Sequence, residues 1–150
     1  MPTRVVIDAC IALKWEFRDE DQGHAEAALG LLSGAIGGSI ELVAPVLWLY
    51  EVVNALRSAA ASSRMSPEDA LRDLHHLLAS GVRLVSQHPD RFNLMLSDAI
   101  ACQCSVYDFS YVDLARQLGC DFFTGDRKLY NLTREVYPFV RWIGDFGAEP

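Results

Sequence analysis

Short apolar runs alternate with longer segments of helical periodicity along this chain. Residues 4–7 are rich in β-branched side chains and end at Asp8, which is typical of a short buried strand. The segment from residue 46 to residue 61 is long, of helical length, and apolar on most sides. The predicted strands cover residues 4–7, 40–43, 82–85, 120–124 and 140–143. The predicted helices cover residues 21–32, 46–61, 66–80, 89–102 and 108–118.

Local signals mark the ends of several of these helices. Ser66 precedes a proline and two acidic residues, which is a typical helix start because the serine hydroxyl can cap free backbone N–H groups. Pro45 is expected to open the helix over 46–61 at its first turn. Gly81 and Gly119 end the helices that precede them. Because strands alternate with helices, we predict an α/β fold with a parallel sheet covered by helices on both faces.

Length and composition favour a single folded domain over residues 1–150. Hydrophobic residues make up 51% of the chain, which is too many for a disordered protein. No apolar stretch approaches the ~18 residues that span a bilayer, and Asp8 interrupts the apolar start too early for a signal peptide. We therefore expect a cytoplasmic protein with no membrane partner. The cysteines form no CxxC pair, so we expect four buried, reduced thiols: Cys10, Cys102, Cys104 and Cys120.

The chain is acidic, with 13 Lys and Arg against 20 Asp and Glu and a formal net charge of −7. This balance argues against a nucleic-acid binder that works through bulk positive charge. Two explanations of the surplus remain open at this point. The acidic residues either solubilise the surface, or some of them gather in one place for chemistry.

Four acidic residues stand out by their positions. Asp8 follows the first predicted strand and Asp126 comes just after the fourth, so their carboxylates converge if those strands are neighbours. Glu51 lies among apolar neighbours in the long helix, with Asn54 one turn further on the same face. Asp108 opens the last predicted helix.

Each of these residues also has a purely structural interpretation. An Asp after a strand is often a turn former or a helix cap, and Asp108 could serve only as an N-cap. Glu51 is harder to explain in this way, because charged side chains on buried faces are rare unless they are paired. The four positions together are therefore more informative than any one of them.

Taken in order, the motifs around these residues resemble a PIN domain, and most closely the VapC-type toxins of bacterial and archaeal toxin–antitoxin pairs. The matching segments are Val-Ile-Asp8 with the residues up to Trp15, Pro45 followed by Glu51-Val-Val-Asn54, Tyr107-Asp108 leading to Leu114-Ala115, and Thr124-Gly-Asp126. Their order and spacing fit the family from residue 5 to about residue 143. The resemblance implies a three-layer α/β/α sandwich around a central parallel sheet of about five strands.

The same resemblance implies a metal-dependent ribonuclease. The residues that match its acidic cluster are Asp8, Glu51, Asp108 and Asp126, and those that match its supporting positions are Asn54 and Thr124. A toxin of this kind is expected to bind a small antitoxin that blocks the acidic pocket, and the apolar breadth of residues 46–61 suggests a homodimer. The alternatives are a housekeeping RNA-processing nuclease of the same family and a non-catalytic binding module with an acidic pocket.

Some positions depart from this pattern or complicate it. Cys10 stands where many relatives carry Ser or Thr, and an aspartyl phosphatase would need a second Asp at that place. Asp113 stands where a neutral residue is more common, and we expect it to be exposed to solvent. Asp98 competes with Asp108 for the third acidic position. We prefer Asp108 because Tyr111 and the apolar residues after it follow in the expected pattern.

Carboxylates gathered in one pocket favour a bound cation. Two of them about 4 Å apart repel by about 4 kcal/mol at an effective dielectric constant of about 20, and a cation relieves that repulsion. Oxygen ligands suit a hard ion, so Mg²⁺ or Mn²⁺ is the expected cofactor. A water acidified by the ion can attack an RNA phosphodiester without a histidine. The histidines lie far from the acids in sequence and are expected on the surface or in packing: His24, His75, His76 and His88.

Holding RNA on a chain with a net charge of −7 requires local basic groups. The candidates are Lys14, Arg18, Arg127 and Lys128. Trp15 and Trp48 flank the proposed site in sequence and are candidates for stacking on bases, with core packing favoured for Trp48. Four other arginines are expected to be solvated: Arg57, Arg64, Arg83 and Arg91.

Overall fold

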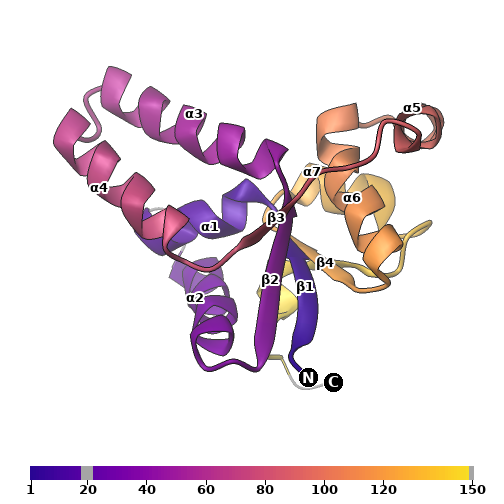
Figure 1. The fold of residues 1–150 in the computed structure, drawn as a ribbon, viewed down its shortest axis with the longest axis horizontal. Coiled ribbons are helices and arrows are strands. Elements are labelled where there is room, and N and C mark those ends of the chain that lie inside the picture. The colour runs from indigo at the N-terminus through magenta and orange to yellow at the C-terminus, as the bar shows by residue number, and fades with distance from the viewer. Residues whose placement is uncertain (18–21, 149–150) are drawn as a thin grey trace.

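The computed structural model describes residues 1–17 and 22–148, and its centre is a five-stranded sheet (Figure 1). The strands are β1 (Thr3–Ile7), β2 (Ile40–Pro45), β3 (Arg83–Val85), β4 (Asp121–Thr124) and β5 (Val140–Trp142). Their order across the sheet is β3-β2-β1-β4-β5, and every neighbouring pair is parallel. The prediction of a parallel sheet of about five strands is therefore confirmed.

Helices lie on both sides of this sheet, with α2 and α6 on opposite sides of the strands in Figure 1. They are α1 (Ala9–Glu16), α2 (Gln22–Ile36), α3 (Leu47–Ala61), α4 (Pro67–Leu78), α5 (Arg91–Cys102), α6 (Val106–Leu118) and α7 (Arg127–Thr133). The five predicted helices correspond to α2–α6 within a few residues, although the expected start at Asp21 lies outside the described residues. Within the described ranges, no helix combines the length and apolar character needed to cross a lipid bilayer.

The strand order brings the first and fourth strands together. β1 lies between β2 and β4, with Ile7 opposite Phe123. The chain segments that leave β1 and β4 therefore emerge side by side at the carboxyl edge of the sheet. This is the condition under which Asp8 and Asp126 were expected to converge.

Two short helices, α1 and α7, differ from the prediction. α1 has 8 residues and begins directly after Asp8, whose side chain accepts the backbone N–H of Ile11 at 3.1 Å. α7 has 7 residues and begins directly after Asp126, whose side chain accepts the N–H of Leu129 at 3.1 Å. Helices this short show too few turns for a clear apolar periodicity. Both aspartates are thus helix caps, in agreement with the structural interpretation that the sequence left open.

Two helix starts also differ from expectation. Pro45 is the last residue of β2 and does not open α3, because the N–H of Val46 still bonds the carbonyl of Val85 at 3.2 Å and keeps the chain paired. Ser105, not Asp108, caps α6, since its hydroxyl accepts the N–H of Asp108 at 3.0 Å. The predicted cap at Ser66 is confirmed by its bond from the N–H of Asp69.

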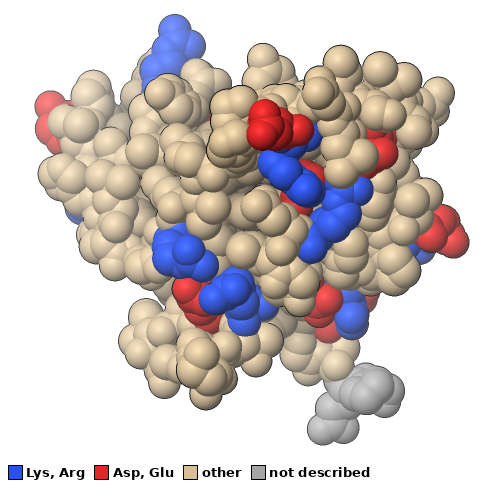
Figure 2. Space-filling model, turned by 45° about the vertical axis from the view of Figure 1, so that its right-hand side comes forward, with Lys and Arg blue, Asp and Glu red and all other residues tan. Residues whose placement is uncertain are grey.

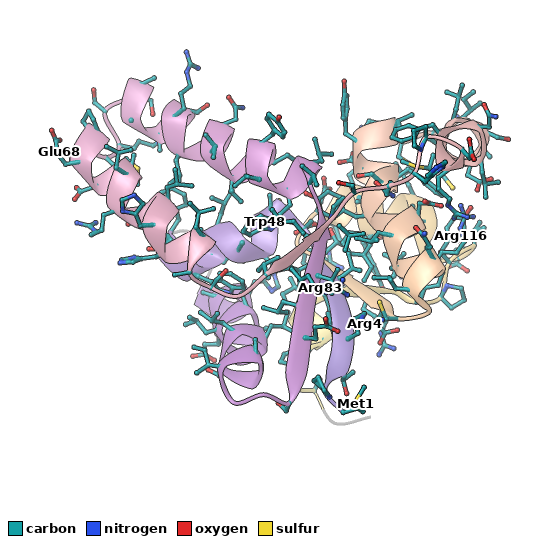
Figure 3. The ribbon with its side chains drawn as sticks, viewed as in Figure 1. Met1, Arg4, Trp48, Glu68, Arg83 and Arg116 are labelled. Atoms are coloured by element: carbon teal, nitrogen blue, oxygen red, sulfur yellow. The ribbon has the colours of Figure 1, made fainter. Side chains whose placement is uncertain are left out.

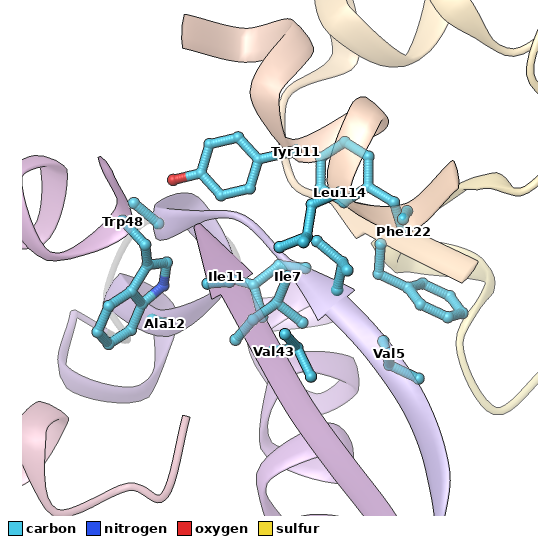
Figure 4. Close-up of a cluster of buried hydrophobic side chains, with 14 of the residues drawn as sticks. Val5, Ile7, Ile11, Ala12, Val43, Trp48, Tyr111, Leu114 and Phe122 are labelled. Atoms are coloured by element: carbon cyan, nitrogen blue, oxygen red, sulfur yellow. The ribbon is translucent and has the colours of Figure 1, made fainter. Parts of the chain in front are cut away.

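The core is built from the central strands of the sheet and the helices packed on them, and Figure 4 shows a part of it with side chains from β1, β2, β4, α1, α3 and α6. Tyr111 of α6 stacks on Phe122 of β4, with ring centroids 5.6 Å apart. Trp48 of α3 is buried in this core, as favoured by the sequence (Figure 3). Trp15 is buried as well and donates its ring N–H to the carbonyl of Ala28 at 2.8 Å. The prediction that Trp15 stacks on bases is therefore wrong.

The four thiols are free, but only Cys102 is buried. Cys10 is exposed because it lies in the first turn of α1, at the open carboxyl edge of the sheet. Cys104 and Cys120 are half-buried next to helix and strand ends, where packing is incomplete. The expectation of four buried thiols is therefore wrong for three of them.

Asp113 is fully buried, which contradicts the expectation that it is exposed. The packing of α5 against α6 brings Arg91 to its carboxylate, at 2.6 Å, and Arg116 approaches from one helical turn further on, at 2.7 Å. Arg91 is thus paired and half-buried, not solvated. Arg57, Arg64 and Arg83 are exposed as expected, although Arg83 also bonds Glu41 at 2.8 Å. Burial acts to raise the pKa of Asp113, but the hydrogen bonds from the two arginines outweigh it and hold the pKa below its usual range.

This pairing predicts that Asp113→Ala strongly destabilises the fold. Removing the carboxylate leaves two partly buried arginines without their shared partner, so the free energy of unfolding should fall by about 3 kcal/mol or more. Urea denaturation measures the difference. Asp90→Ala is the matched control, because that carboxylate is 90% exposed and its removal should change stability by less than about 0.5 kcal/mol. Equal effects of the two substitutions would contradict a structural role for Asp113.

Candidate active site

The four acidic residues predicted from sequence line one small pocket. Its volume is about 70 Å³, and it lies at the carboxyl edge of the sheet, where β1 and β4 end. The lining residues are Asp8, Ala9, Cys10, Glu51, Asp108, Tyr111, Asp126 and Leu129. The carboxylates come from four separate parts of the chain: the end of β1, helix α3, helix α6 and the end of β4. Asn54 is exposed on α3 and is not among the lining residues.

Asp8 is the most firmly held of these carboxylates. One oxygen accepts the N–H of Ile11, and the other accepts the Thr124 hydroxyl at 2.5 Å and the N–H of Gly125 at 3.3 Å. Burial nevertheless raises the pKa of Asp8 to about 7, with the charge of Glu51 acting in the same direction and the hydrogen bonds opposing it. Among the described residues, no basic side chain donates to this carboxylate.

Thr124 joins the two strand-end aspartates. Its buried hydroxyl donates to Asp8 and accepts the backbone N–H of Asp126 at 2.9 Å. The same Asp126 caps α7 through one carboxylate oxygen. A single hydroxyl therefore fixes the position of Asp8 relative to the turn that carries Asp126, as expected of a supporting residue.

Glu51 is positioned by Tyr111, which the sequence marked only as part of the pattern that follows Asp108. The Tyr111 hydroxyl donates to a carboxylate oxygen of Glu51 at 2.5 Å. Burial raises the pKa of Glu51, and the charge of Asp108 acts in the same direction, whereas the tyrosine bond opposes them. The Tyr111 hydroxyl was the one sequence signal of this role, because a buried tyrosine usually needs a polar partner.

Asp108 lies in the first turn of α6 and completes the pocket. Burial raises its pKa, and the charge of Asp126 adds to that effect, whereas the hydrogen bond with Ser105 and the charge of Lys128 oppose it. The competing candidate, Asp98, lies outside the pocket and bonds Arg116 at 2.8 Å. The choice of Asp108 over Asp98 therefore agrees with the geometry.

The donor set of this pocket fits a hard divalent cation. Four carboxylates line it, and none of its lining residues is Lys, Arg or His. Three of the four carboxyl groups have raised pKa values, in part because of their mutual repulsion. Oxygen ligands with surplus negative charge are the environment that Mg²⁺ and Mn²⁺ prefer. Asp8, Glu51, Asp108 and Asp126 are the residues that would hold such an ion.

Cys10 contributes a protonated thiol to the same pocket. Cys10 is exposed as a residue, but desolvation of its thiol beside the pocket, together with the negative charges of Asp8 and Asp126, raises the pKa of Cys10 to about 12. The thiol is therefore neutral at physiological pH and poorly suited to act as a nucleophile.

A second group of possible metal ligands lies elsewhere, between α1 and α4. Ligand atoms of Glu16, Asp73 and His76 all lie within 4.8 Å of one another. Asp73 also contacts Arg72 at 3.4 Å, and His76 is exposed. This group could not be recognised from the sequence, because its members come from distant segments and only Asp73 and His76 share a helix face.

The raised pKa of Asp8 predicts that the metal-free protein loses stability as the pH increases. The pKa is about 7 in the folded chain against an ordinary value of 3.8, so the stabilisation is fully present below about pH 4 and is lost through pH 7. In EDTA, the free energy of unfolding should fall by on the order of 2 kcal/mol between pH 5 and pH 8 because of this group. Mg²⁺ should restore stability at pH 8.

Urea denaturation at both pH values, with EDTA or MgCl₂, measures this effect. Asp8→Asn is the control that isolates the group, because its amide does not titrate. An unchanged pH dependence in Asp8→Asn would contradict the assignment.

Comparisons with known proteins agree with the fold and the family expected from the motifs. The PIN domain family model matches residues 5–135. The crystal structure of PAE2754 from Pyrobaculum aerophilum is similar, with a TM-score of 0.68 and 22% sequence identity over 95% of this chain and 92% of that chain. No curated protein sequence matches. Because the family match spans most of the chain, this protein belongs to the PIN domain family, whose members are generally nucleases that use divalent metal ions.

Proposed function

We propose that this chain is a Mg²⁺-dependent endoribonuclease that hydrolyses RNA phosphodiester bonds. The observation that carries the proposal is the convergence of four carboxylates, without a basic lining residue, at the carboxyl edge of a parallel sheet. When bound there, the divalent ion lowers the pKa of water and offsets negative charge on the leaving oxygen. Mn²⁺ would serve in the same way, because it shares the preference for oxygen ligands.

The protein's own part in this reaction is to hold charged oxygens in fixed positions. Asp8 and Asp126 are the proposed direct ligands, because their backbone and hydroxyl partners fix both of them. Glu51, held by Tyr111, would bind the ion or orient the attacking water. Asp108 would complete the site or hold a second ion. No described histidine lines the pocket, which agrees with hydrolysis by an activated water.

We further propose that the enzyme is the toxin of a toxin–antitoxin pair, acting in the cytoplasm and forming a homodimer. The order of the four acidic motifs supports the toxin assignment. An apolar groove of about 360 Å³ supports a protein partner; it runs from Pro45 and Leu47 to Phe92, Met95 and Tyr107. Tyr107 precedes Asp108 directly, so a small antitoxin seated in this groove would reach the acidic pocket.

The proposal predicts that Asp8→Asn and Asp126→Asn abolish cleavage. Each substitution removes a charged ligand but retains a side chain that can cap a helix, so cleavage of RNA in Mg²⁺ should fall by on the order of a hundredfold or more while the fold persists. A gel assay with Mg²⁺, and with EDTA as a blank, measures cleavage, and circular dichroism checks folding.

Asp98→Asn is the matched control for these variants. It removes a carboxylate that lies outside the pocket and should leave cleavage unchanged. Undiminished cleavage by both Asp8→Asn and Asp126→Asn would overturn the proposal.

A further inference from the structure

We propose that a strip along α7 binds single-stranded RNA next to the acidic pocket. The strip consists of Arg127, Tyr130 and Arg134, with Trp142 of β5 beneath Arg127, and we call it the α7 strip. The inference rests on the proposed ribonuclease function and identifies where its substrate is held.

The first observation is that most of the described arginines already have a carboxylate partner. Figure 2 shows a face on which basic and acidic side chains lie in small mixed groups. Arg4 and Arg83 share Glu41, Arg72 pairs with Asp69, Arg91 and Arg116 share Asp113, and Arg141 approaches Asp121. Asp73 and Asp98 add further carboxylates beside Arg72 and Arg116, so each of these arginines is less available to a polyanion than an unpaired one.

The remaining cations gather near the acidic pocket. Over residues 1–17 and 22–148, the Lys and Arg side chains without a carboxylate within 4.0 Å are Lys14, Arg57, Arg64, Arg127 and Lys128. Arg127 and Lys128 follow Asp126 directly, and the Lys14 side chain lies close to Gly125. Arg57 and Arg64 lie along and beyond the distal half of α3. Positive charge available to a phosphate is therefore concentrated at the pocket.

The second observation is the stacking that holds the strip in place. The guanidinium carbon of Arg127 lies 3.7 Å from the ring centroid of Trp142 and 5.9 Å from that of Tyr130. Arg134 lies 5.4 Å from the Tyr130 centroid. Stacking on an aromatic face restrains a planar guanidinium while leaving its N–H edges free for a phosphate.

The sheet places this stack beside the pocket. Trp142 lies opposite Thr124 in the neighbouring strand, and Thr124 is the residue that joins Asp8 to the turn before α7. Adjacent strands are about 4.8 Å apart, so the stack is about one strand away from the acidic cluster. Trp142 is itself buried and therefore a rigid base for Arg127.

The alternation of guanidinium and ring is suited to single-stranded RNA. Unpaired nucleotides present phosphates to the arginines and base faces to a guanidinium or ring plane, whereas a duplex hides its base faces. Arg134 has one carboxylate within 4.0 Å, Glu135 at 3.6 Å, and that side chain is 84% exposed, so a phosphate can replace it readily. A small number of phosphate contacts is what a chain with a net charge of −7 can offer, because it has no bulk positive charge.

The test compares two double variants that remove the same charge. Arg127→Gln with Arg134→Gln disrupts the α7 strip. Arg57→Gln in the distal half of α3 with Arg64→Gln just beyond that helix is the matched control, which we call the α3 control. Binding of a fluorescein-labelled oligouridylate is followed by anisotropy in EDTA, so that cleavage cannot interfere, at several salt concentrations. The strip variant should bind about tenfold more weakly, and its log–log salt slope should be shallower by about 1.4, because two phosphate contacts are lost. The control should bind like the wild type.

Two further measurements separate this inference from the proposed function. Arg127→Lys with Arg134→Lys keeps the charge but not the planar stack, and it should bind more weakly than the wild type. In Mg²⁺, the loss in the glutamine variant should appear in KM and not in kcat. Wild-type binding by either strip variant, or a strip variant indistinguishable from the α3 control, would overturn the α7 strip. RNA binding without any cleavage by the wild type would instead overturn the ribonuclease proposal and leave the strip supported.

Discussion

The hydrogen bonds to the Asp8 carboxylate connect the fold of this protein to its pocket. One carboxylate oxygen starts helix α1 through the N–H of Ile11, and the other holds the end of β4 through Thr124 and Gly125. These bonds are possible only because β1 and β4 are parallel neighbours, so that both strands end at the same edge of the sheet. The turn that follows β4 then carries Asp126 to the same place, and α3 and α6 add Glu51 and Asp108.

Two buried aspartates of this chain illustrate opposite uses of the same side chain. Asp113 is paired with Arg91 and Arg116, and its pKa is lowered. Asp8 is buried among other carboxylates, and its pKa is raised to about 7. The first arrangement satisfies its charge within the protein and ties two helices together. The second leaves the carboxylate without a basic partner among the described residues, which is the environment in which a divalent cation can bind.

Much of the architecture could be predicted because strands and helices leave different periodic patterns. Asp8 and Asp126 were expected to converge only if their strands were neighbours, which the structure shows. The order of the motifs added Glu51 and Asp108 to the same group. The helices α1 and α7 could not be predicted in the same way, since each is too short for a repeating pattern and takes its cap from a residue singled out for chemistry.

Contacts between distant segments were the other feature that could not be predicted from the sequence. The burial of Asp113 depends on how α5 packs on α6, and the bond from Tyr111 to Glu51 joins residues 60 positions apart. The sequence places such residues on helix faces but does not say which helix they meet. The same limit concealed the stack of Arg127 on Trp142, which depends on β5 lying next to β4.

The most direct test of the central claim is Mn²⁺ binding measured by electron paramagnetic resonance. The wild type is compared with Asp126→Asn, which alters the acidic pocket, and with His76→Ala, which alters the separate Glu16, Asp73 and His76 group. If the four carboxylates form the metal site, Asp126→Asn loses most of the bound Mn²⁺ and His76→Ala retains it. Unchanged binding by Asp126→Asn, or loss of binding in His76→Ala alone, would contradict the account.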